Sequence, residues 1–385
     1  MKRIILLSTF VLTQTIFATT LTIYNSNLAL IDESIDFTIE QNTTQFSYDA
    51  IPKTIIDDSV SLAVPKGVEI QEQHFKSRAL LPASLAKKST LKPTLSFDLT
   101  TTQAYKTKVH LNYLMHGISF KNDYRIDLQK EKANLTAWVD ITNNSGKDFK
   151  DVSINLLAGD TAHNRYPTEP IMLRSNISMA PGKKIIQHHA IAGYHKYNLT
   201  KKTDLKSYEK SRIKLFSLNN LPYKNSYIAQ MNNPLYLMGE RTSSVTREIH
   251  FNTIPREMPQ GTIRIYTNDS NELLFLGDQH IQNQPKAMPL TLHVGKDFDT
   301  KVRQELIQRD DTKTAFNVTV KYTLINHSQN DKILTLRIPF NKKIGSKVTS
   351  TLHYSYTKGN YVTFQVKVKA NSQRSFEANF TSKRR

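Results

Sequence analysis

The chain has 385 residues, and its 52 Lys and Arg exceed its 33 Asp and Glu, which gives a formal net charge of +19 at pH 7. It contains no cysteine, so disulfide scaffolds, cysteine-ligated zinc, iron–sulfur clusters and thiol nucleophiles are excluded. A hydrophobic share of 38% and a charged share of 22% argue against wholesale disorder, and the length suits two or three domains of about 150 residues.

The N-terminus predicts a secretory signal peptide. Lys2 and Arg3 precede an apolar stretch from residue 4 to residue 17, which ends at the small residue Ala18. This order is typical of export signals, and we expect cleavage after Ala18. A membrane anchor is the weaker alternative, because polar residues interrupt the stretch and it falls short of the about 20 apolar residues that span a bilayer. Since no later segment approaches that length, we expect no transmembrane segment after cleavage.

Alternation of apolar and polar residues predicts strands along the N-terminal part of the chain. Residues 34–39 and 60–64 place apolar side chains at every second position. Two further strands are expected at 137–141 and 152–157, because the Asn, Ser and Gly of residues 143–147 predict a turn between them.

Helix is expected only in short pieces. The best candidate covers residues 79–88, where Pro82 lies in the first turn and therefore removes no helical hydrogen bond. Residues 208–216 fit either a helix or a strand.

The C-terminal part alternates most regularly. Residues 318–324, 334–338, 361–368 and 375–380 keep apolar side chains on one face. Region 302–381 therefore holds about six short strands at the spacing of an immunoglobulin-like sandwich. No fixed-period repeat points to a propeller or a solenoid.

These patterns predict an all-β protein of two or three antiparallel β-sandwich modules, with an immunoglobulin-like C-terminal module and at most short helices. We expect a signal peptide at 1–18, an N-terminal β region at 19–104, a central β-sandwich at 105–295 and the C-terminal sandwich at 296–385.

Known catalytic motifs are absent. The chain lacks Gly-x-Ser-x-Gly, His-Glu-x-x-His and the glycine-rich phosphate-binding loop, which weighs against the commonest serine hydrolases, zinc peptidases and nucleotide-binding proteins. The best group of metal-ligand candidates is His188 and His189, with His195 and His163 nearby in sequence. Adjacent strand residues point to opposite faces, so only one of His188 and His189 could face a given site. We therefore interpret them as strand histidines and assign no metal or cofactor.

The candidate acids lie in pairs or follow a glycine: Asp297 with Asp299, Asp310 with Asp311, and Asp160 and Asp278. Paired carboxylates could bind calcium or act as an acid and a base. The remaining oxygen ligands are missing, however, and turn aspartates that accept backbone N–H groups are the favoured interpretation. No catalytic residue is assigned.

The positive charge is spread along the chain. Removing Lys2 and Arg3 with the signal peptide lowers the net charge from +19 to +17, and the Lys and Arg residues are scattered, with short basic runs such as Lys201-Lys202 and residues 383–385. Such a charge attracts anionic envelope glycans or lipid head groups, while export makes nucleic acid an unexpected partner. The alternative is that the charge serves solubility alone. Nine Asn-x-Ser/Thr sequons occur, and we attribute them to an Asn- and Thr-rich composition.

Several segments resemble one exported β-protein family. They are Leu21–Ile31, Asn112–Phe120 with Tyr124, Trp138–Gly146, Leu156–Asp160, Met258–Tyr266, Leu276–Asp278 and Val294–Asp299. In their order and spacing they resemble the family described as domain of unknown function 4139, which is related to the C-terminal part of mucoidy-inhibitor-like proteins. Phe120 stands where that family usually has Trp. The resemblance implies exported or envelope-associated β-sandwich modules and implies no catalytic residues.

Three functions remain open. A periplasmic or secreted interaction protein without catalysis is favoured, with an envelope protein as its partner. An envelope hydrolase acting on glycan or peptide is the alternative, and would use Asp160 or Asp278 with a nearby histidine. A binder of anionic polysaccharide or lipid head groups is the third. The oligomeric state is not predicted.

Overall fold

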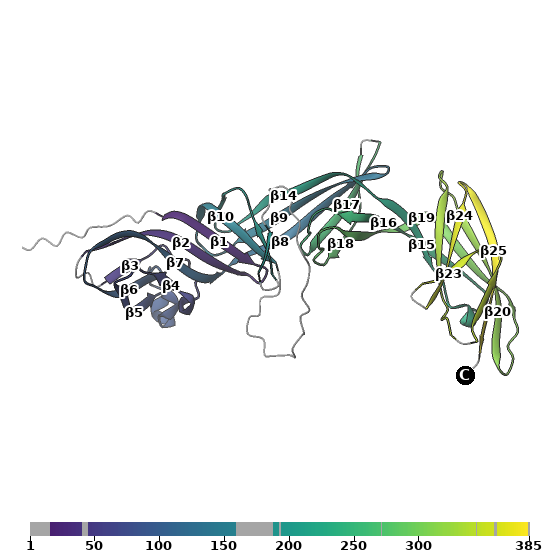
Figure 1. Cartoon of the computed structure of the whole chain (residues 1–385), viewed down its shortest axis with the longest axis horizontal. Helices are drawn as coiled ribbons and strands as arrows, with labels where there is room; N and C mark the ends of the chain where they lie inside the picture. Colours follow the sequence, from purple (N-terminus) through teal and green to yellow (C-terminus); the bar gives the residue numbers. More distant parts are fainter. Residues whose placement is uncertain are drawn as a thin grey trace, which may run out of the picture. The chain divides into compact units, whose positions relative to one another are not determined.

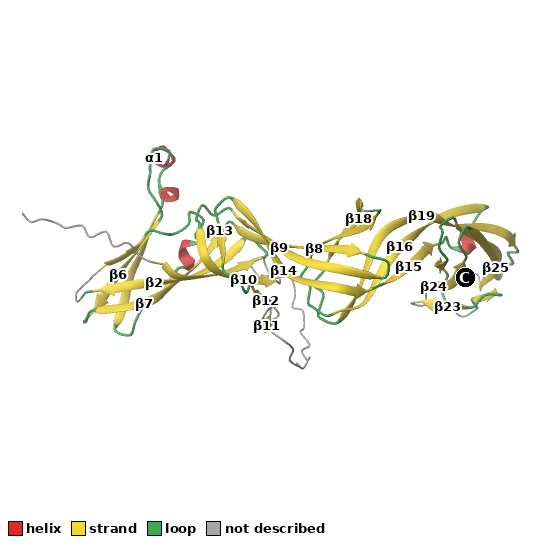
Figure 2. Ribbon diagram, turned by 90° about the horizontal axis from the view of Figure 1, so that it is seen from above, coloured by secondary structure: helices red, strands yellow, loops and turns green. Residues whose placement is uncertain are grey.

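The structure is a computed structural model that describes residues 16–40, 45–158, 188–191, 194–270, 272–343, 345–357 and 360–383. It is nearly all β, with 69% strand and 4% helix. The predicted all-β class is therefore confirmed. Figures 1 and 2 show the strands and the few helical turns.

The chain divides into two compact units. Unit 1 comprises Met1–Asn122 and Trp138–Leu215, and unit 2 comprises Asp123–Ala137 and Phe216–Arg385. Each unit has its own hydrophobic core. Among the described residues, the strands form four sheets.

The largest sheet of unit 1 has the order β11-β12-β10-β1-β2-β7-β4, and β13 pairs with β10. Its strands are β1 (Ile16–Tyr24), β2 (Leu28–Ile39), β4 (Ser61–Ala63), β7 (Tyr105–His116), β10 (Phe149–Ala158), β11 (His188–Ile191), β12 (Tyr194–Asn198) and β13 (Thr203–Leu205). A small sheet of order β3-β6-β5 consists of β3 (Gln45–Tyr48), β5 (Val68–Lys76) and β6 (Thr94–Thr101).

The other two sheets have five and nine strands. The five-stranded sheet, of order β14-β9-β8-β17-β18, consists of β8 (Ile118–Leu128), β9 (Lys132–Asn143), β14 (Glu209–Pro222), β17 (Gly261–Asp269) and β18 (Glu272–Ile281). The nine-stranded sheet has the order β22-β25-β20-β19-β16-β15-β21-β24-β23. Its strands are β15 (Lys224–Gln230), β16 (Glu240–Ile254), β19 (Met288–Arg309), β20 (Ala315–Asn326), β21 (Lys332–Pro339), β22 (Lys347–Ser350), β23 (Tyr354–Thr357), β24 (Tyr361–Val368) and β25 (Ser372–Lys383).

Helical structure is limited to single turns within the described ranges. These are η1 (Asp57–Ser59), η2 (Arg78–Leu80), α1 (Ala83–Ala86) and η3 (Pro234–Tyr236). The short helix expected near residues 79–88 is present as η2 and α1. Of residues 208–216, which fit either a helix or a strand by sequence, all but Tyr208 lie in strand β14. None of the helices in the described part of the chain has the length and apolar character needed to cross a bilayer.

The apolar side chains of the alternating segments lie in the cores, as predicted. On β20, Val318, Val320, Tyr322 and Leu324 are all 0% exposed, while the residues between them face outward or are less buried. The matching positions of β21, β24 and β25 bury their apolar side chains in the same core. On β2, Ile35, Phe37 and Ile39 do so in unit 1. Period-two alternation buries one face of each strand, which fixes its register.

The two units share one strand arrangement. In unit 1, β1 pairs in parallel with β10 and antiparallel with β2, which pairs antiparallel with β7. In unit 2, β15 pairs in parallel with β21 and antiparallel with β16, which pairs antiparallel with β19. The segments that connect the four equivalent strands differ in length and in number of strands between the two units. The repeated arrangement therefore produces no fixed period in the sequence.

A turn motif, Asn-x-Ser-x-x-Asp, recurs at equivalent places in the two units. Asn143 donates from Nδ2 to the carbonyls of Lys147 (2.9 Å) and Leu205 (3.1 Å), and its Oδ1 accepts from Ser145 Oγ (2.7 Å). Asp148 accepts from the backbone N–H of Ser207 (2.8 Å). The Asn side chain therefore ties the turn to a distant segment of its own unit.

The second copy has almost the same geometry. Asn326 Nδ2 donates to the carbonyls of Asn330 (2.9 Å) and Lys369 (3.0 Å), and Oδ1 accepts from Ser328 Oγ (2.7 Å). Asp331 accepts from the backbone N–H of Ala370 at 3.0 Å. Asn143 and Asn326 are 1% and 0% exposed, so these two sequons have a structural explanation that composition does not supply.

Candidate functional site

A basic loop of unit 1 borders a pocket. The loop covers residues 77–93 between β5 and β6 and contains η2 and α1. Ser77 caps η2 by accepting the N–H of Ala79 at 3.1 Å, and Pro82 precedes α1. Figure 2 shows α1 on a loop that extends beyond the strands. Because both helical pieces are single turns, the loop leaves much of its side-chain surface uncovered.

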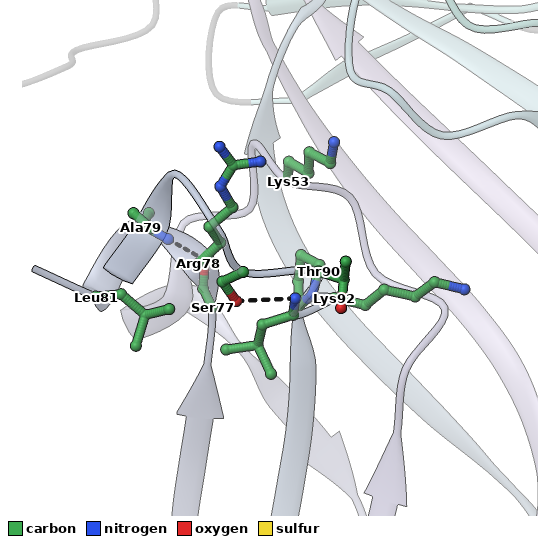
Figure 3. A pocket seen from close by; sticks show the side chains of 11 residues that line it. Lys53, Ser77, Arg78, Ala79, Leu81, Thr90 and Lys92 are labelled. Atoms are coloured by element: carbon green, nitrogen blue, oxygen red, sulfur yellow. Dashed lines mark hydrogen bonds between the residues drawn. The ribbon is translucent and has the colours of Figure 1, made fainter. Parts of the chain in front are cut away.

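The pocket has a volume of about 720 Å³ and combines an apolar lining with cationic side chains. Leu81, Leu91 and Pro93 contribute apolar surface. Lys53, and Arg78 and Lys92 of the loop itself, also line it (Figure 3). Among the described residues, no carboxylate lines it. A cavity with these walls suits a ligand that is negatively charged at one end and apolar at the other.

The charge of the loop has one sign. From residue 76 to residue 93 the chain has five cations and no acid. The cations are Lys76, Arg78, Lys87, Lys88 and Lys92, and all are exposed. Within the described part of the chain, no ion pair is formed by any of them. Their charge is therefore available to a ligand.

Leucine side chains project from the same loop. Leu80 is 63% exposed, Leu85 is 59% exposed and Leu91 is 40% exposed. Isolated exposed leucines are ordinary, but these three all belong to one short cationic loop. The positive charge looked diffuse along the sequence, and this loop was not predicted as a site. The signal that could have identified it is the absence of acids from residue 76 to residue 93.

The histidines predicted as candidate ligands are only partly described. His188 and His189 lie on β11, and His195 lies opposite Ala190 on β12. Their strand placement agrees with the prediction. His163 lies outside the described residues, as does Asp160.

The structure does not bring the described candidate acids, Asp278, Asp297, Asp299, Asp310 and Asp311, together into one site. Asp297 binds Lys332 Nζ through both carboxylate oxygens, at 3.0 and 2.8 Å, and is thereby neutralised. Asp299 is exposed. Asp310 accepts from Gln308, Asp311 pairs with Arg309 at 3.4 Å, and Asp278 is exposed on β18.

Two buried lysine–carboxylate networks were not foreseen from the sequence. In unit 1, Lys147 Nζ lies 2.6 Å from Glu33 Oε1, and the hydroxyl of Tyr48 donates to Glu33 Oε2 at 2.7 Å. Lys147 also donates to Tyr113 at 3.1 Å. In unit 2, Lys332 binds Asp297 and donates to Thr300 at 3.1 Å. Buried charged groups can mark active sites, but here their hydrogen-bonding capacity is taken up within the protein, so we interpret both networks as structural.

The unit 1 network predicts a loss of stability at high pH. Burial, with the negative charge of Glu33 next, raises the pKa of Tyr48 and of Tyr113 far above the ordinary value of 10.0. The folded state therefore keeps protons that the unfolded state loses, and the free energy of unfolding should fall as the pH rises above about 10. Urea titrations at pH 8 to 11 should show that the free energy of unfolding falls more steeply with pH for the wild type than for Tyr48→Phe. Equal slopes would contradict this prediction.

Comparison with known proteins adds no assignment. The chain matches no protein-family model, and no curated protein matches its sequence. Its function must therefore be inferred from its own residues.

Proposed function

We propose that this chain is an exported, non-catalytic envelope protein that docks on anionic lipid surfaces through loop 77–93. One observation carries this proposal: cations without acidic partners and exposed leucines occur together in the loop that borders the pocket. The cations attract the anionic head groups, and the leucines enter the apolar layer beneath them.

The magnitudes suit reversible docking. Each Lys or Arg near an anionic membrane surface contributes about 1 kcal/mol, so Arg78, Lys87, Lys88 and Lys92 together supply about 4 kcal/mol. Leu80 and Leu85 add apolar burial, which is worth at most about 1.5–3 kcal/mol for a fully buried leucine side chain. Both contributions together therefore support reversible docking.

The leucines favour lipid over the other partners considered. An anionic polysaccharide would be held by the cations alone and would leave Leu80 and Leu85 in water. A hydrolase would need convergent acids or histidines in one pocket, and the described lining of the pocket at loop 77–93 includes neither. The sequence resemblance to the family described as domain of unknown function 4139 is compatible with an envelope role and is itself a proposal.

Export is proposed from the signal sequence. Cleavage after Ala18 would leave residues 19–24 of β1, whose pairing with β2 is regular from Ala18 onward. N-terminal sequencing of the protein recovered from the cell envelope should give Thr19 as the first residue. A chain that retains Met1 would contradict export by a cleaved signal.

Vesicle binding tests the docking proposal. The mature protein should co-sediment with vesicles containing phosphatidylglycerol and not with pure phosphatidylcholine vesicles. A variant with Arg78, Lys87, Lys88 and Lys92 all changed to Gln should bind at least 100-fold more weakly, since about 4 kcal/mol corresponds to roughly three powers of ten. Leu80→Ser with Leu85→Ser should weaken binding about 10-fold or more.

Lys201→Gln with Lys202→Gln is the matched control for Lys87→Gln with Lys88→Gln, because each change removes two adjacent exposed cations of the same unit, the control outside the loop and the test within it. It should change binding less than threefold. If the control and loop variants lose vesicle affinity equally, the net charge of the protein, and not loop 77–93, causes the binding. Full competition by a soluble anionic polysaccharide, with no effect of the leucine changes, would assign the loop to glycan instead.

A further inference from the structure

Three potential metal ligands lie on the outer face of the small sheet in unit 1. Glu72 of β5 is directly opposite Asp98 of β6, and His74 follows two residues later on the same face of β5. A β-bulge between Ile70 and Glu72 produces this register. Without the bulge, Gln71 would face Asp98, and Glu72 and His74 would point to the other face.

The distances in this cluster suit a shared cation better than hydrogen bonds. His74 Nε2 lies 3.3 Å from Glu72 Oε2 and 3.4 Å from Asp98 Oδ2. A charge-assisted hydrogen bond is about 2.7–2.9 Å long, and the exposed pair of His110 Nδ1 and Asp32 Oδ1 reaches 2.8 Å. In a tetrahedral site with metal–ligand bonds of about 2.0–2.1 Å, ligand atoms lie about 3.3–3.4 Å apart.

Electrostatics also favours a cation at this point. Like charges that face each other across two strands are destabilising, and Glu72 and Asp98 are such a pair. Gln45 donates to the other oxygen of Asp98, Oδ1, at 3.1 Å, which leaves Oδ2 turned toward His74. A hydrogen bond to the carboxylate oxygen that does not bind the metal can orient a metal ligand. The nearest cation on the same face of β5 is Lys76, which is exposed.

We propose that Glu72, His74 and Asp98 form a zinc-binding site, with a water molecule in the fourth position. One imidazole nitrogen with two carboxylate oxygens suits Zn²⁺, whereas Mg²⁺ and Ca²⁺ prefer oxygen ligands alone. The side chains of His74, Glu72 and Asp98 are 46%, 67% and 38% exposed, so the ion can enter from solvent. The bound ion would join edge strand β5 to β6. This proposal is independent of membrane docking.

Calorimetric titration of the mature protein with zinc chloride tests the site. The wild type should bind one equivalent, and His74→Gln should weaken binding at least 10-fold. Glu72→Gln should also weaken zinc binding at least 10-fold. His110→Gln, which removes an exposed histidine of the same unit that is already hydrogen-bonded, should leave the affinity unchanged. Zinc should also raise the melting temperature of the wild type and not that of His74→Gln, because only the folded wild type binds it.

Two results would overturn the proposal. Zinc binding that is equally tight in His74→Gln and Glu72→Gln would place the ion elsewhere in the chain. Tighter binding of Ca²⁺ or Mg²⁺ than of Zn²⁺ by the wild type would show that the imidazole is not a ligand. Since all three side chains are at the surface, the variants are expected to fold, and circular dichroism checks this for each.

Discussion

Asn143→Ala should lower the free energy of unfolding of unit 1 by about 3–5 kcal/mol, since each buried polar group left without a partner costs about 1–3 kcal/mol. The substitution removes the amide that donates to the carbonyls of Lys147 and Leu205 and the oxygen that accepts from Ser145. These groups are enclosed, since Asn143 is 1% exposed and Ser145 is 2% exposed. Water cannot replace the lost bonds without opening the turn.

The measurement uses the single tryptophan of the chain, Trp138, which belongs to unit 1. Urea unfolding followed by its fluorescence gives the free energy directly. Asn144→Ala is the control, because Asn144 is the exposed neighbour and keeps its backbone N–H bond to Gly117. It should change the free energy by less than about 0.5 kcal/mol. Similar effects of the two substitutions would show that the buried amide does not hold the turn.

Lys147→Met should lower the free energy of unfolding of unit 1 by as much as Asn143→Ala does, because it leaves the charge of Glu33 without a cationic partner. The Glu33 side chain is 1% exposed, and Lys147 supplies its ion pair at 2.6 Å. Removing one partner of a buried pair costs about 3–5 kcal/mol, chiefly through the uncompensated charge that remains. The loss of the contacts between Lys147 and the rings of Tyr113 and Phe149 adds to the effect.

A double-mutant cycle separates these contributions. Glu33→Gln keeps an acceptor for the hydroxyl of Tyr48 and removes the charge. The double variant with Lys147→Met should therefore be at least 1 kcal/mol more stable than the sum of the single losses predicts. Lys150→Met, at an exposed lysine of β10, is the control and should be nearly neutral. Strictly additive losses would show that Lys147 and Glu33 do not act as a pair.

Local sequence determined most of the strands. The alternation at residues 318–324 and 34–39 predicted which side chains are buried, because side chains of a strand point alternately to opposite faces wherever the strand lies. The turn at residues 143–147 was predicted from its Asn, Ser and Gly. The partners of Asn143 were not predictable, since Leu205 is remote in sequence.

The sequence by itself therefore determined an all-β chain, the turn at residues 143–147, the helical turns near residues 79–88 and the exclusion of cysteine chemistry from the composition. Only the tertiary structure decided which polar groups meet. Glu33 finds Lys147 through the fold of unit 1, and Asp98 faces Glu72 only because of a one-residue bulge. The charge of +19 looked diffuse along the sequence, but the acid-free loop of residues 77–93 forms a pocket with Lys53. Period and turn chemistry are local properties, whereas pairing across strands depends on register, which long-range packing sets.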